Sequence, residues 1–119
     1  MHDTLLEELT SSLYFRYSFS IAMIKDISTA MTEYATAAVI DSIIQAELHS
    51  GLDGPYLGQL AAQLVKKYPT LKESEVIAIK DALNEYAVSA VLDTEVQKEL
   101  FSEKEVRRKA CINCECSHN

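Results

Sequence analysis

The chain has little of what loop-rich or disulfide-bonded proteins require. Its 119 residues include no tryptophan, three glycines, two prolines and three cysteines. All the cysteines fall within the last nine residues, and an odd, clustered set is a poor disulfide framework. Reduced thiols are typical of the cytoplasm, so we expect that location. No apolar run approaches the length of a membrane span, and the N-terminal stretch MHDTLLEEL is acidic, where a signal peptide would be basic. We therefore expect a soluble protein without membrane contact.

Signatures of catalysis are also missing. The three glycines, Gly51, Gly54 and Gly58, form no phosphate-binding loop, and the sequence contains neither a nucleophile elbow nor a catalytic Cys–His arrangement. Alternating patterns and β-rich runs are absent as well, so no strand is expected. The sequence therefore predicts an all-α protein that is not an enzyme.

Two stretches of the chain, 52 positions apart, are copies of one another. Residues 32–48 read TEYATAAVIDSIIQAEL and residues 84–100 read NEYAVSAVLDTEVQKEL. Nine of the seventeen positions are identical, where composition alone would give about one. The similarity extends backwards with a one-residue shift, which pairs Leu13, Arg16 and Tyr17 with Leu64, Lys67 and Tyr68. The repeated unit is a short helix followed by a long one.

This repeat predicts a four-helix bundle built from a duplicated short-long helical hairpin, with a Cys-rich C-terminal tail. The hairpins span residues 3–50 and 54–108 of a single domain, 1–110, and the tail covers 111–119. A two-repeat fragment of a helical solenoid is the alternative, disfavoured because two repeats seldom suffice for a solenoid.

Capping signals give the expected helix bounds. Thr4 with Glu7, and Thr70 with Glu73, have the spacing of a capping box. Proline is favoured in the first turn of a helix and ends one elsewhere. We expect helices from Asp3 or Thr4 to Tyr17, from Ser18 or Ser20 to about His49, from Pro55 to Pro69, and from Thr70 onward.

A helical wheel places Ile27, Met31 and Tyr34 of the second helix on an apolar stripe and Glu47 on the opposite, polar face. The stripe of each long helix also includes an aspartate. Asp41 is followed one turn later by Gln45, and Asp93 by Gln97. Two such carboxylates near a pseudo-twofold axis are able to share a proton or hold a metal, which is the basis of an enzyme or metal-carboxylate alternative. The structural alternative, which we favour, is that each aspartate bonds a tyrosine hydroxyl, a glutamine or a helix N-terminus.

The C-terminal tail carries the strongest chemical signal. Cys111, Cys114, Cys116 and His118 include a Cys-x-x-Cys pair and make a nominal set of four zinc ligands. All four lie within eight residues, so a metal would need ligands from elsewhere, such as His49, His2 or a second chain. The competing reading is a frayed thiol-rich terminus without metal. The alternative function is thus a metal- or redox-responsive regulator with Zn as its cofactor.

Features found in only one copy point to a partner. Residues 1–65 carry eight acids and two bases, which argues against direct nucleic-acid binding because phosphate contacts require Lys and Arg. Ile40, Ile43 and Ile44 form a candidate partner-binding patch, and the alternative is that the short helix covers them. The preferred function is a small acidic protein that binds another macromolecule, or itself, as an adaptor, inhibitor or regulatory subunit.

Overall fold

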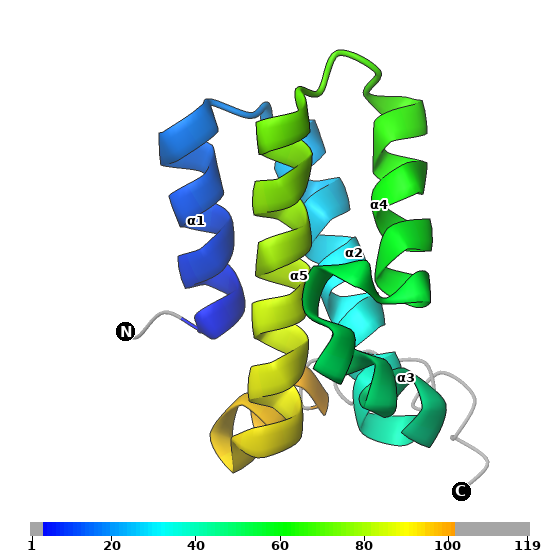
Figure 1. Cartoon of the computed structure of the whole chain (residues 1–119). Coiled ribbons are helices and arrows are strands. Elements are labelled where there is room, and N and C mark those ends of the chain that lie inside the picture. The colour runs from blue at the N-terminus through cyan, green and yellow to red at the C-terminus, as the bar shows by residue number, and fades with distance from the viewer. Residues whose placement is uncertain (1–3, 102–119) are drawn as a thin grey trace, which may run out of the picture.

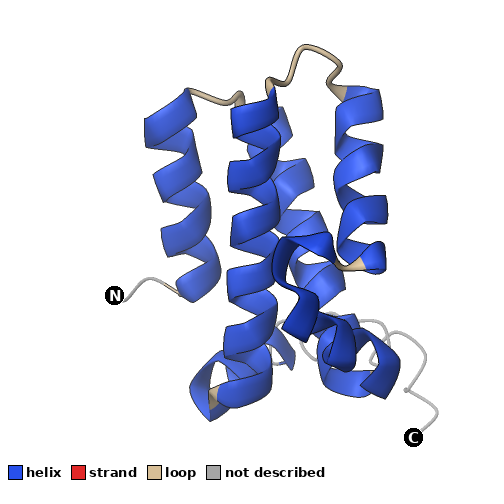
Figure 2. Cartoon of the chain, viewed as in Figure 1, coloured by secondary structure: helices blue, strands red, loops and turns tan. Residues whose placement is uncertain are grey.

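The computed structural model describes residues 4–101, and this part of the chain is all-helical, without strands (Figure 2). The prediction of an all-α protein is confirmed. None of the helices in residues 4–101 has the combined length and apolar character needed to cross a bilayer. The elements are α1 (Leu5–Tyr17), α2 (Ile21–Ile40), α3 (Ser42–Glu47), the 3-10 helix η1 (Leu48–Asp53), α4 (Pro55–Lys67) and α5 (Glu73–Leu92), and residues 94–101 are also helical.

The long helices α2 and α5 form the centre of the molecule. They lie side by side, run in the same direction and share the most extensive contact in the fold (Figure 1). The shorter helices α1 and α4 run the opposite way, and each packs against both α2 and α5. The segment α3–η1 turns back after α2, and η1 packs against α5. Both long helices therefore end at the same end of the molecule, drawn lowest in Figure 1.

The first two helices begin at side-chain caps. The Thr4 hydroxyl accepts a hydrogen bond from the Glu7 amide at 3.1 Å, and the Glu7 carboxylate accepts one from the Thr4 amide at 3.2 Å. This confirms the predicted capping box, which satisfies amides that have no partner within the helix. Ser20 caps α2 through the Met23 amide at 3.1 Å. Between them Ser18 adopts a left-handed conformation, with φ 55°, and ends α1.

The second pair of short and long helices begins differently. Pro55 is the first residue of α4, as predicted, because proline tolerates a position whose amide would lack a partner. The predicted capping box of Thr70 with Glu73 is wrong. Helix α5 begins at Glu73, and the Glu75 carboxylate accepts from the Lys72 amide at 2.8 Å. The spacing of a capping box is therefore found two residues later, between Lys72 and Glu75.

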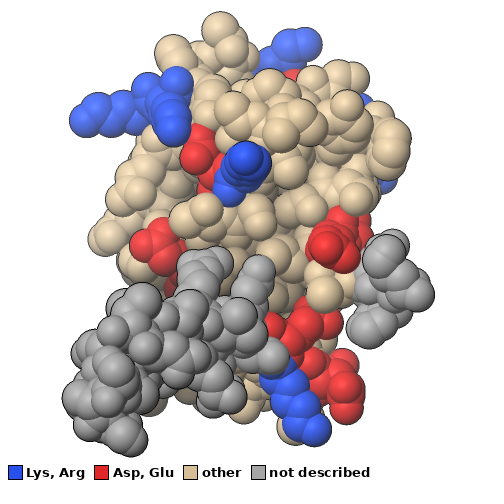
Figure 3. Space-filling view, turned by 180° about the vertical axis from the view of Figure 1, so that it is seen from behind, with Lys and Arg blue, Asp and Glu red and all other residues tan. Residues whose placement is uncertain are grey.

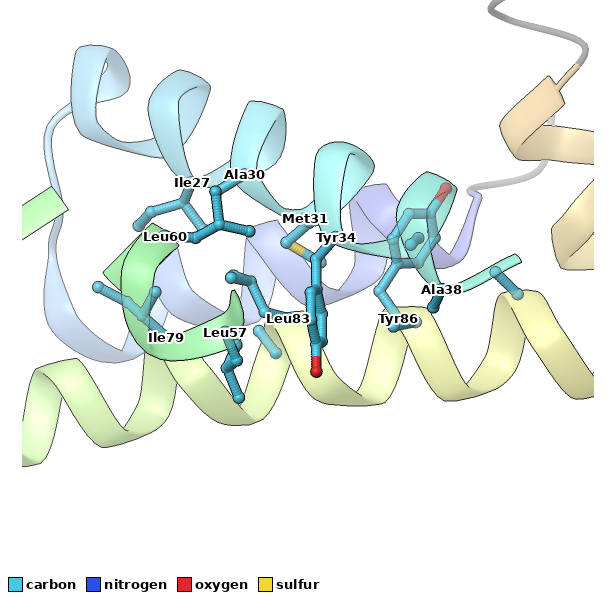
Figure 4. Close-up of a cluster of buried hydrophobic side chains, with 14 of the residues drawn as sticks. Ile27, Ala30, Met31, Tyr34, Ala38, Leu57, Leu60, Ile79, Leu83 and Tyr86 are labelled. Atoms are coloured by element: carbon cyan, nitrogen blue, oxygen red, sulfur yellow. The ribbon is translucent and has the colours of Figure 1, made fainter. Parts of the chain in front are cut away.

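The core lies between α2 and α5 and is closed by the short helices (Figure 4). The predicted apolar stripe is buried on both long helices, and full burial of a large apolar side chain contributes about 1.5–3 kcal/mol. Figure 4 shows the hydroxyl groups of Tyr34 and Tyr86 pointing in opposite directions from this core. The buried stripe residues include Ile27, Ala30, Met31, Tyr34 and Ala38 of α2 and Ile79, Ala82, Leu83, Tyr86 and Ala90 of α5.

The prediction that the second helix runs to about His49 is wrong, because Asp41 breaks it. Asp41 has an extended backbone, with φ −120° and ψ 115°. Its carboxylate accepts from the amides of Ile43 at 2.9 Å and Ile44 at 3.4 Å, so it caps a new helix, α3. Asp93 has nearly the same backbone angles, φ −113° and ψ 114°, and its carboxylate accepts from the Glu95 amide at 2.9 Å. The same turn is made after both long helices.

The glutamines one turn after these aspartates explain how the turns are held. A helix that stops leaves its last carbonyl groups without partners. The Gln45 side-chain amide donates to the Ala38 carbonyl at 3.0 Å, and the Gln97 amide donates to the Ala90 carbonyl, also at 3.0 Å. Asp41 and Asp93 are exposed rather than buried, so their predicted place on the apolar stripe is wrong. Of the partners expected for the two aspartates, a helix N-terminus is the one found among residues 4–101.

Candidate functional site

The segment after α2 is anchored by a carboxylate that lies against the start of α4. Glu47 Oε2 accepts hydrogen bonds from the Tyr34 hydroxyl at 3.0 Å, the Tyr56 amide at 3.1 Å and the Leu57 amide at 3.2 Å. Two of these donors are the first free amides of α4, where negative charge is favoured by the helix dipole. Glu47 therefore acts as the side-chain cap of α4, since Gly54 itself offers none.

Gly54 leaves the space that this carboxylate occupies. A Cβ atom at position 54 would lie 2.4 Å from Glu47 Oε2 and 2.9 Å from its Cδ, well inside van der Waals contact. The backbone of Gly54, with φ −63° and ψ 138°, is open to any residue. Glycine is thus needed here for close approach and not for its conformational freedom.

Burial and the Glu47 hydrogen bond raise the pKa of the Tyr34 hydroxyl far above its usual range, with burial the larger cause. Tyr34 remains a protonated donor at all physiological pH values. Its partner is Glu47 and not Asp41. The second copy repeats part of the arrangement, because Glu99 accepts from the Leu5 amide at the start of α1 at 3.3 Å. Each repeated glutamate thereby fastens a turned segment to the N-terminus of a short helix.

Helices α2 and α5 stop at the same end of the molecule (Figure 1). Large aliphatic side chains near these helix ends are exposed. The exposed fractions are 71% for Ile40, 77% for Ile43 and 79% for Leu92. Ile44 instead is partly buried and packs against the core. Within residues 4–101, then, no helix covers Ile40 or Ile43, whereas Ile44 is mostly withdrawn from the predicted patch. That this surface binds a partner stays a prediction.

A largely apolar pocket opens at the same end, between α5 and the α3–η1 segment. Its volume is about 390 Å³. The Glu47 anchor and the Gln45 hydrogen bond hold one wall in place, since both tie the turned segment to its neighbours. Exposed Leu92 belongs to the opposite wall. The lining residues are Gln45, Leu48, His49, Val88, Val91 and Leu92.

The structure does not gather a metal site in the part of the chain it describes. Within residues 4–101, no three His, Cys, Asp or Glu side chains are placed to hold one ion. The predicted ligands Cys111, Cys114, Cys116 and His118 lie outside the described residues, as does His2. His49 lines the apolar pocket.

Sequence reasoning missed Glu47, Gly54 and Leu92. Glu47 was assigned to the polar face of a longer helix, although its identity with Glu99 in the repeat was a usable signal. Leu92 occupies the repeat position of Ile40, and both are exposed, so the alignment of the copies could have added it to the patch. Gly54 has no sequence signal beyond its place before Pro55.

Comparisons with protein-family models, with curated proteins and with solved structures find no match to this chain, so its function must be argued from its own residues.

Proposed function

We propose that the chain is a four-helix bundle made of a duplicated short-long helical hairpin, and that it acts by binding another macromolecule as an adaptor, inhibitor or regulatory subunit. The duplication is supported by the equal lengths of α2 and α5 and by the matching turns after them, with Asp41 and Gln45 in one copy and Asp93 and Gln97 in the other. A bundle is supported by α1 and α4, which flank the central pair.

The exposed aliphatic end is the observation that carries this function. Ile40, Ile43 and Leu92 are each more than two thirds exposed, and Leu92 borders the apolar pocket. We infer that these three side chains form one surface at this end of the molecule, and exposed aliphatic surface of that kind usually marks a binding site on a small protein. The shape, a groove beside projecting side chains, suits the apolar face of a helix from a partner or from a second copy.

Charge supports a protein partner over nucleic acid. The first 65 residues hold eight acids and two bases, whereas nucleic-acid sites gather Lys and Arg on one surface. On the face in Figure 3, the basic side chains are scattered over a largely uncharged surface. We assign the protein no catalytic role, and the reduced cysteines expected for the tail favour a cytoplasmic location.

Aspartate substitutions at matched exposed positions test the proposal. Ile43→Asp and Ile40→Asp place a charge on the proposed surface, and Phe15→Asp places one on α1 at the opposite end, where Phe15 is 81% exposed. Tagged wild-type and variant chains are returned to the native cell, and co-purified proteins are quantified by mass spectrometry. Sedimentation velocity reports self-association.

We expect Ile43→Asp and Ile40→Asp to lose the partner or the self-associated form, while Phe15→Asp keeps it. Circular dichroism should show unchanged helicity in all three variants, because an exposed substitution costs at most about 0.5 kcal/mol. Equal binding by wild type, Ile40→Asp and Ile43→Asp would contradict the assignment of this surface.

A further inference from the structure

A second groove lies between α1 and α5, with a volume of about 380 Å³. Its apolar side chains include Leu13, from the edge of the core, and Ile77, which is 49% exposed. Arg16 and Tyr17, at the C-terminal end of α1, line the groove together with Ala78 of α5. Figure 1 shows α1 and α5 adjacent along this length.

The other copy of the hairpin shows what the same arrangement does when a carboxylate is present. Arg16, Tyr17 and Ala78 correspond in the repeat to Lys67, Tyr68 and Asp26. There the Lys67 ammonium lies 2.9 Å from Asp26 Oδ2, and the Tyr68 hydroxyl donates a hydrogen bond to the same oxygen. In this copy a base and a tyrosine at the end of the short helix thus both donate to one carboxylate on the long helix.

These contacts shift the pKa values of Asp26 and Lys67. The Tyr68 hydrogen bond, followed by the Lys67 hydrogen bond, lowers the pKa of Asp26. The hydrogen bond to Asp26 and the negative charge of that carboxylate raise the pKa of the Lys67 ammonium. The carboxylate is therefore charged and bound to both donors near neutral pH.

In the copy that forms the groove, the carboxylate is replaced by the methyl group of Ala78. Neither Arg16 nor the Tyr17 hydroxyl has a hydrogen-bond or ion-pair partner within residues 4–101. The Tyr17 ring is fixed by stacking on Phe19, with centroids 5.4 Å apart. The donors are thus in place, and residues 4–101 supply no acceptor for them.

We propose that this groove binds a partner segment that presents an aspartate or glutamate side chain next to apolar residues. The ligand carboxylate takes the position that Asp26 holds in the other copy, accepts from Arg16 and Tyr17, and is followed by apolar side chains on Leu13 and Ile77. Arginine and a hydroxyl are strong donors to a carboxylate, and an arginine can bind both of its oxygens.

Two further lining residues set the direction of the segment. Asp81 and Glu85 lie one and two turns beyond Ala78 along α5 and face the same groove. They repel a second acid and favour a base at that end. The preferred ligand therefore reads acid, apolar, apolar, base, with the acid at the Arg16 end.

A peptide titration tests this inference independently of the Ile40–Ile43 end. The probe is the blocked tetrapeptide acetyl-Glu-Leu-Leu-Lys-amide, added at millimolar concentrations to the ¹⁵N-labelled full chain and followed by NMR. The matched control peptide has Gln in place of Glu. We expect chemical-shift changes centred on Arg16, Ile77 and Ala78, and about fivefold weaker binding of the Gln peptide, as for the loss of one exposed ion pair.

Ala78→Asp rebuilds the closed arrangement and should abolish binding, because its own carboxylate then occupies Arg16 and Tyr17. Ala78→Asn, similar in size but uncharged, should weaken binding less than Ala78→Asp, because its amide fills the same space but is a weaker acceptor for Arg16 and Tyr17. The thermal midpoint of Ala78→Asp shows whether the variant folds. Asp26→Ala is the converse, since it should open a second site and make Lys67 and Tyr68 respond to the peptide.

The inference is overturned by equal binding of the Glu and Gln peptides, by an unchanged affinity in Ala78→Asp, or by the absence of shift changes near Arg16. Shift changes confined to Ile40 and Ile43 would also overturn it while leaving the proposed function intact. Conversely, normal peptide binding by Ile43→Asp would show that this groove binds independently of the exposed aliphatic end.

Discussion

Replacing Glu47 or Gly54 tests how the turned segment after α2 is held. Glu47→Ala removes the carboxylate that accepts from Tyr34 and from two amides of α4. Gly54→Ala keeps that carboxylate but puts a Cβ atom 2.4 Å from its Oε2, so the carboxylate must move away from α4. Both changes should weaken the same set of hydrogen bonds.

The cost can be worked from the contacts. Loss of an N-cap costs about 1 kcal/mol, and a buried tyrosine hydroxyl without an acceptor costs about 1–3 kcal/mol. Tyr34 has no exposed surface, so water does not replace its partner. Glu47→Ala should therefore lower the free energy of unfolding by about 2–4 kcal/mol. Gly54→Ala should lower the free energy of unfolding by a smaller amount, about 1–2 kcal/mol, because the carboxylate is displaced but not removed and is solvated in its new position.

The decisive result is a change of sign. With Glu47 replaced by Ala, the three atoms nearest to a Cβ at position 54 are removed, and Gly54→Ala should then stabilise the protein by about 0.4–1 kcal/mol through the unfolded chain. Gly58→Ala is the matched control, because Gly58 lies inside α4 with no atom near its would-be Cβ. That change should stabilise by about 0.5–1 kcal/mol in either background.

Urea unfolding of the single and double variants, followed by circular dichroism at 222 nm, measures these differences. If Gly54→Ala destabilises the protein equally with and without Glu47, the glycine does not serve the carboxylate, and our account of the anchor is refuted. A stabilising Gly54→Ala in the wild-type background would have the same consequence.

Three further predictions concern pH, the turns and the tail. Because the pKa of Tyr34 is raised in the folded state, the free energy of unfolding should fall as pH rises above about 10, by up to about 1.4 kcal/mol per pH unit. In Tyr34→Phe the urea midpoint should fall less steeply with pH. The same dependence of the midpoint on pH in both proteins would count against the buried hydroxyl. Asp41→Ala and Asp93→Ala should each cost about 1 kcal/mol in urea unfolding as lost caps, and a cost near zero would reject that role. If the tail is a zinc site, protein purified without chelator contains stoichiometric zinc by elemental analysis, lost in the Cys111→Ser, Cys114→Ser double variant; metal-free wild type removes that hypothesis.

The sequence predicted the long helices but not where they end. Apolar spacing identified Ile27, Met31 and Tyr34 as core residues, and all three are buried. The same spacing continues past Asp41 into α3, because the new helix also presents apolar residues to the core. A helical wheel therefore does not detect the break at Asp41. The available signal was chemical, since aspartate readily caps a helix and both copies have it at the same position.

The error at Asp41 also explains why the anchor was not predicted. On one continuous helix, Glu47 falls on the polar face and has no reason to meet Tyr34, thirteen positions earlier. Once the chain turns at Asp41, Glu47 faces the start of α4. Its role depends on tertiary contacts that exist only after the break. By contrast, exposure of Ile40 needed only the local helix geometry and was within reach of the sequence.

Comparison of the two copies separates what the fold needs from what it leaves open. The Asp and Gln pairs make equivalent hydrogen bonds in both copies, so the turns account for them. Ala78 differs, because Asp26 at the matching position satisfies a base and a tyrosine. An exposed ion pair contributes little to stability, so stability gives the fold little reason to keep or lose that aspartate. Within residues 4–101 the groove keeps both donors without an acceptor, which favours our proposal of an acceptor on another molecule. Ala78→Asp tests that proposal by adding a single carboxylate to the groove.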